Sequence, residues 1–81
     1  MDPELLANSI RKVNGVRQVN RVRSRWIGTD KSVDLVISVD SDISTNDSHK
    51  IATAVESVIE KEYDVSDISI HIEPYYEKSK N

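Results

Sequence analysis

The apolar residues near the start of the chain recur at the spacing of a helix. They are Leu5, Leu6, Ile10 and Val13. A proline stands near the beginning of this run and Gly15 follows its end, which is the usual punctuation of a helix. The pattern predicts a short helix from about Pro3 to Asn14.

The period then changes to two, which is typical of strands. In the segment from Val16 to Ile27, arginines alternate with Val22, Ser24 and Trp26. Apolar residues from Val33 to Val39 alternate with Asp34, Val36, Ser38 and Asp40. The four residues 28–31 between these two strands predict a turn and a hairpin.

Two details of the hairpin follow from this turn. If it contains four residues, Arg25 lies directly opposite Asp34, and the simplest interpretation is a cross-strand salt bridge. Trp26 shares a face with Val22, so we expect it to cap the end of the core, with a dimer contact as the alternative. The pairing of Arg25 with Asp34 depends on the register of the two strands.

A second helix and a third strand complete the pattern. Ser44 and Asp47 resemble a capping box at the start of a helix from about Thr45 to Tyr63. Its apolar stripe is formed by Ile51, Val55, Val58 and Ile59. Isoleucines then alternate with polar residues from Ile68 to Glu73, which predicts a strand that stops at Pro74. The polar segment from Tyr75 to Asn81 is expected to be frayed, with Tyr75 and Tyr76 loosely packed or at a subunit edge.

The order helix, strand, strand, helix, strand defines an α+β fold in one domain, residues 1–81. The second and third strands are joined through a helix, so they should be parallel with a right-handed crossover. Both helices then cover one face of a three-stranded sheet. The other face is left to solvent or to a partner.

Composition limits the functions that this chain can have. It has 81 residues and no cysteine, which excludes a disulfide framework and a thiolate metal site. No apolar run approaches the ~20 residues that span a bilayer, and the start does not resemble a signal peptide. We therefore expect a soluble cytoplasmic domain, small enough to gain stability from dimerisation.

The net charge of −3 is unevenly distributed. Up to Lys31 there are seven basic and three acidic side chains, and beyond it four basic and eleven acidic. The acidic part suits a cation better than a polyanion. A basic stripe of Arg21, Arg23 and Arg25 keeps a nucleic-acid-binding module as an alternative. The strand centres lack the aromatic platforms of single-strand binders, so a solvated or salt-bridged face is favoured and no nucleic acid is expected.

Two histidines and nearby carboxylates are the candidate metal ligands. His49 lies about 140° from the apolar stripe of its helix, so it is not a core residue. His71 and Glu73 alternate with core isoleucines and point to the open face, as does Asp34. The helix and the third strand each run about 20 Å and reverse between them, which brings His49 to the end that holds His71 and Glu73. Imidazoles and carboxylates suit Zn²⁺. The alternative is a pair of ordinary surface histidines.

An enzyme is not expected. The chain has no cysteine nucleophile, no glycine-rich phosphate loop, and no serine with an evident histidine and aspartate beside it. The chain is expected to bind a ligand or partner rather than to catalyse a reaction.

Four blocks in order resemble the cytoplasmic domain of cation diffusion facilitator (cation efflux) transporters and cover nearly the whole chain. They are GVRQVNRVRSRWIG at 15–28, VDLVISVD at 33–40, SHKIATAVE at 48–56 and IHIEP at 70–74. The resemblance implies a ferredoxin-like fold and a V-shaped homodimer below a membrane domain that exchanges divalent cations for protons. That transmembrane domain is missing from this chain.

The resemblance also implies a ligand set. His49, His71 and Glu73 match metal-binding positions of the family, and Asp34 matches an acidic position near the dimer axis. Asn20 and Val36 stand where well-known zinc exporters have histidine, which favours a weaker site shared across the dimer. A divalent ion, zinc by preference, would relieve repulsion between facing ligands and close the arms. A dimerisation scaffold that needs no metal remains the alternative.

Overall fold

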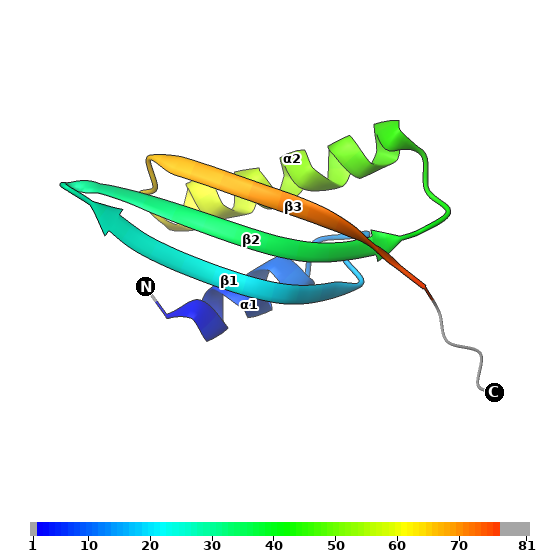
Figure 1. Cartoon of the computed structure of the whole chain (residues 1–81), viewed down its shortest axis with the longest axis horizontal. Coiled ribbons are helices and arrows are strands. Elements are labelled where there is room, and N and C mark those ends of the chain that lie inside the picture. Colours follow the sequence, from blue (N-terminus) through cyan, green and yellow to red (C-terminus); the bar gives the residue numbers. More distant parts are fainter. Residues whose placement is uncertain (1, 77–81) are drawn as a thin grey trace.

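A computed structural model describes residues 2–76 and contains the five predicted elements in the predicted order (Figure 1). They are α1 (Pro3–Arg11), β1 (Gln18–Ile27), β2 (Asp30–Asp40), α2 (Thr45–Glu62) and β3 (Asp67–Tyr75). The sheet order is β1-β2-β3, with β1 antiparallel and β3 parallel to β2. The predicted α+β fold with a parallel crossover is confirmed.

Both helices lie on one face of the sheet, as Figure 1 shows. The central strand β2 supplies the middle of the core, because Val33, Leu35 and Ile37 are fully buried. They belong to one cluster with the fully buried residues of the helices, which are Leu6, Ile10, Val55 and Ile59. Each such side chain contributes about 1.5–3 kcal/mol on leaving water. The alternation in β2 therefore fixes which face the helices cover.

A β-bulge at Asn20 changes the alternation of β1. Val19 pairs with Ile37 and Val22 pairs with Leu35, so both valines face the helices although they are three residues apart. Asn20 is the extra residue between them and has no partner in the register. It therefore lies next to Arg21, which pairs with Val36 on the open face.

The hairpin turn is shorter than the sequence suggested, and this corrects the predicted pairing of Arg25. Ile27 pairs with Asp30, so the turn contains only Gly28 and Thr29. Gly28 has a φ of 65°, as two-residue hairpin turns require. The register moves by two residues, which keeps each side chain on its face. Arg25 is thus opposite Ser32, and Arg23 is opposite Asp34.

Trp26 does not cap the core, contrary to expectation. It is 66% exposed, and the Lys31 ammonium lies 5.2 Å from the centre of its ring. On the face that the helices cover, the buried row nearest the turn is that of Val33, which pairs with Ser24. The hairpin continues for three more pairs past that row, and Trp26 belongs to the second of them, opposite Lys31.

The ends of the elements differ from the prediction by a few residues. Helix α1 ends at Arg11 rather than near Asn14, whereas α2 begins as predicted, with the Ser44 hydroxyl accepting from the Asp47 N–H at 3.0 Å. Strand β3 passes through Pro74 to Tyr75, which an edge strand tolerates because one side needs no N–H donor. The expected frayed segment beyond Tyr76 lies outside the described residues.

Candidate metal site

The open face of the sheet brings Asp34 and His71 together. In the register, Asp34 lies in one row with Arg23 and Ser69, and the next row contains Arg21, Val36 and His71. These side chains line a hollow of about 240 Å³ to which all three strands contribute. The sequence-predicted pair Asp34 and His71 therefore shares one cavity.

Asp34 already has a cationic neighbour. The Arg25 guanidinium lies 3.6 Å from the Asp34 carboxylate, diagonally across the two strands. The salt bridge that the sequence predicted is therefore present, although Arg25 is not directly opposite. Both side chains are partly exposed, at 60% and 34%, so the pair contributes about 0.2–1 kcal/mol at most. A ligand that binds Asp34 would therefore have to break only this weak ion pair with Arg25.

Glu73 lies one row further along the open face and is held by the bulge residue. The Asn20 side-chain amide donates to Glu73 at 3.0 Å and to the hydroxyl of Ser38 at 2.8 Å. Ser38 is only 4% exposed although it lies on the face that the helices leave uncovered. Asn20 thus joins all three strands, a role that the sequence reasoning missed. The break in the alternation between Val19 and Val22 was the available signal.

His49 lies in a different hollow, of about 320 Å³. It is exposed on the first turns of α2, and the hollow is completed by residues at the ends of β2 and β3, namely Asp40, Ile72 and Pro74. The predicted closeness of the start of α2 to the end of β3 is therefore seen. The Asp40 carboxylate is bound by Arg17 at 2.6 Å, and the same guanidinium lies 4.8 Å from the centre of the Tyr75 ring.

The described part of one chain does not assemble a complete metal site. Among residues 2–76, no group of three or more histidine, aspartate or glutamate side chains could hold a metal ion. Zinc sites in proteins use three or four protein ligands. Asp34 and His71 are half of such a set, and His49 is separated from them by the edge of the sheet.

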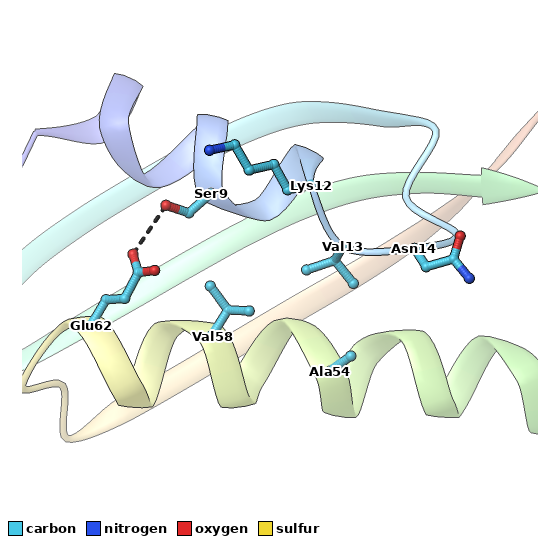
Figure 2. Close-up of a pocket in the computed structure, with 7 residues that line it drawn as sticks. All are labelled: Ser9, Lys12, Val13, Asn14, Ala54, Val58 and Glu62. Carbon is cyan, nitrogen blue, oxygen red and sulfur yellow. Dashed lines mark hydrogen bonds between the residues drawn. The ribbon is translucent and has the colours of Figure 1, made fainter.

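The helical side has a hollow of a different character, between α1 and α2 (Figure 2). Its volume is about 450 Å³, and Val13, Ala54 and Val58 form its apolar part. The Ser9 hydroxyl donates to Glu62 at 3.0 Å across it. None of the four candidate metal ligands lines this hollow.

The chain belongs to the family described as cation efflux protein, cytoplasmic domain, whose model matches residues 2–75. It is 32% identical to the manganese efflux system protein MneP of Bacillus subtilis over 96% of this chain. It is 30% identical to the manganese efflux system protein MneS of the same organism over 86% of this chain. The chain spans about a quarter of the length of these curated relatives, 28% and 24% respectively.

Solved structures of MamM CTD have the same fold. A copper form has a TM-score of 0.81 at 27% identity, covering 90% of this chain and 72% of the other. A manganese form of a variant has a TM-score of 0.78 at 26% identity, covering 89% and 92%. The ferredoxin-like α-β-β-α-β fold is thus confirmed. In the described part of this chain, no helix has the length and apolar character that crossing a bilayer requires.

Proposed function

We propose that this chain is the metal-sensing, dimerising cytoplasmic domain of a divalent-cation efflux transporter. The observation that carries the proposal is the pairing of Asp34 with His71 in one hollow on the face that the helices leave uncovered. A second copy facing this surface would add its own Asp34 and His71. The four donors would then match the coordination number of a tetrahedral divalent ion.

Metal binding in this arrangement would work by electrostatics. Without metal, Asp34 is held by Arg25 and Glu73 by Asn20, both through exposed contacts. Carboxylates that face each other across a dimer repel, and a bound cation removes that repulsion. Because the cation has a higher affinity for the closed arrangement, it shifts the population toward closed arms. Displacing Arg25 costs only the small energy of an exposed ion pair.

The choice of metal follows from the ligand types. Imidazole with carboxylate suits Zn²⁺, which is the ion expected from the sequence. Manganese is the second candidate, because two relatives are manganese efflux proteins and carboxylates are ligands that Mn²⁺ prefers. Neither ion requires the chain to catalyse a reaction. The proposed partners are a second copy and the transmembrane part of a transporter, with the domain on the cytoplasmic side.

His49 has a separate role in the proposal. It lies around the sheet edge from His71, in the hollow that contains Asp40. It would support a peripheral and weaker metal position, with Glu73 reaching it only from a second copy or after release from Asn20. Removing His49 should therefore affect binding less than removing His71.

Calorimetric titration with Zn²⁺ and with Mn²⁺ tests the proposal. We expect saturable binding that Asp34→Asn and His71→Ala each weaken at least tenfold, a loss of about 1.4 kcal/mol or more. His49→Ala is the matched control and should weaken it less. The His49→Ala/His71→Ala variant should lose it entirely.

The closing of the arms requires its own measurement. The chain has no native cysteine, so a spin label at Glu60→Cys, on exposed α2, reports one distance between two copies. We expect the distance to shorten when metal is added. Absence of binding by either ion, with a stable dimer in sedimentation, would leave the metal-independent scaffold as the function.

A further inference from the structure

The open face carries more positive charge than its carboxylates neutralise. Within residues 2–76 the salt bridges are Arg17 with Asp40 and Arg25 with Asp34. In that part of the chain, Arg21 and Arg23 form no ion pair. Both line the 240 Å³ hollow, whose only carboxylate among the described residues is Asp34, already matched by Arg25. The hollow and the adjacent Arg25 therefore bring three guanidinium groups against one carboxylate, which leaves an excess of positive charge.

The register places hydrogen-bond donors on two sides of this hollow. Arg21 and Arg23 project from β1, while Ser69 and His71 occupy the same two rows on β3. The two outer strands are about 10 Å apart, since each strand spacing is roughly 4.8 Å. Val36, between Arg21 and His71, forms an apolar floor. The space between the donors is suited to a small tetrahedral anion.

We propose that this hollow binds a phosphate group, as inorganic phosphate or a small phosphomonoester. Arg21 and Arg23 supply planar guanidinium forks, which match phosphate oxygens in pairs. The Ser69 hydroxyl and a ring N–H of His71 donate from the opposite side. Arg25 has a supporting role, because its contact with Asp34 reduces the repulsion between that carboxylate and the anion.

The compact shape of the hollow distinguishes this site from a nucleic-acid interface. A polyanion needs charge along a track and stacking platforms, whereas these donors converge on one cavity. The site does not rest on the proposed metal function, although it shares Asp34 and His71 with it. The two ligands should respond oppositely at Asp34, because its charge attracts a metal ion and repels phosphate.

The test is a titration of the whole chain with inorganic phosphate in a phosphate-free buffer, followed by amide chemical shifts in NMR. We expect saturable shifts centred on residues 21, 23, 69 and 71. Arg21→Gln and Arg23→Gln should each weaken binding about fivefold to tenfold, the loss of one charge-assisted contact. Arg11→Gln is the matched control, because it removes the same charge from α1 on the other face of the sheet, and it should change the affinity less than twofold.

The substitution Asp34→Asn separates the two proposals. It should strengthen phosphate binding severalfold while weakening metal binding. If metal binding is absent but phosphate behaves as described, the metal function fails and the anion site stands. No saturable phosphate binding, or equal losses in Arg11→Gln and Arg21→Gln, would overturn the anion site. Binding to phosphatidylglycerol–phosphatidylcholine vesicles without binding of free phosphate would also overturn it.

Discussion

A methyl group added at Gly15 should destabilise this domain strongly. Gly15 lies between α1 and β1 with a φ of 99°, a region that residues with a Cβ rarely adopt. A Cβ there would lie 2.6 Å from Cδ1 and 2.8 Å from Cγ1 of Ile51 on α2. Both distances are well inside van der Waals contact, so either Ile51 or the connection must move.

The expected loss combines two costs. The left-handed backbone costs about 1–2 kcal/mol and crowding against Ile51 about 1–3 kcal/mol. Alanine also restricts the unfolded chain more than glycine does, which offsets about 0.4–1 kcal/mol of the loss in stability. Gly15→Ala should therefore lower the free energy of unfolding by about 1–4.5 kcal/mol. At roughly 0.05–0.15 kcal/mol per residue, the whole domain has only about 4–12 kcal/mol.

Gly28→Ala is the control for backbone strain alone. Gly28 has a φ of 65°, and nothing lies within 4 Å of a Cβ added there. It should cost only about 1 kcal/mol. Urea denaturation followed by circular dichroism gives both values, and it avoids Trp26, whose exposure in the folded state makes its fluorescence a poor probe.

A double substitution isolates the contact. In Gly15→Ala/Ile51→Ala the crowding is removed. The double variant should therefore lose less stability than the sum of the two single variants, by about 1 kcal/mol or more. If Gly15→Ala costs no more than Gly28→Ala, or if the two losses at Gly15 and Ile51 simply add, the close packing of α2 against this connection does not contribute to stability.

Three further outcomes follow from the structure. Ser44→Ala should lower the free energy of unfolding by about 0.5–2 kcal/mol through loss of the cap on α2, whereas Ser57→Ala, exposed in mid-helix, should not lower it in the same urea titration. Ile59→Ala should cost about 2–5 kcal/mol because Ile59 is fully buried, and a loss below 1 kcal/mol would contradict its place in the core. Protons compete with a metal ion for an imidazole nitrogen, so the calorimetric Zn²⁺ affinity should be lower in acid than at neutral pH, and an unchanged affinity would exclude His71 as a ligand.

The sequence predicted the fold because the strongest signals in it are the strand periodicities. The alternation of Val33, Leu35 and Ile37 identifies the buried face of β2 without any knowledge of its neighbours. The length of the hairpin turn was not predictable in the same way, because both a two-residue and a four-residue turn keep every side chain on its face. The position of Arg25 relative to Asp34 depended on that choice alone.

The candidate site was predicted only in part, for a similar reason. Periodicity assigns Asp34 and His71 to one face, and the parallel pairing of β2 with β3 then brings them into one hollow. It assigns no partner to Asn20, whose contacts depend on the bulge. The exposure of Trp26 depends on how far the hairpin extends beyond the core, which local pattern does not encode.

The bulge at Asn20 divides β1 into two parts, and the residues that face away from the helices change from even-numbered to odd-numbered positions between them. Before it, even-numbered residues such as Gln18 face away from the helices, and after it odd-numbered residues such as Arg21 do so. Deleting Asn20 would leave this arrangement intact, because Val19 would then adjoin Arg21 and inner and outer residues would alternate regularly along the whole strand. The deletion would instead remove the amide that joins the Ser38 hydroxyl on the central strand to Glu73 on β3. The extra residue is therefore not needed to keep the valines in the core, and its consequence is a polar link that runs across the open face from one edge of the sheet to the other.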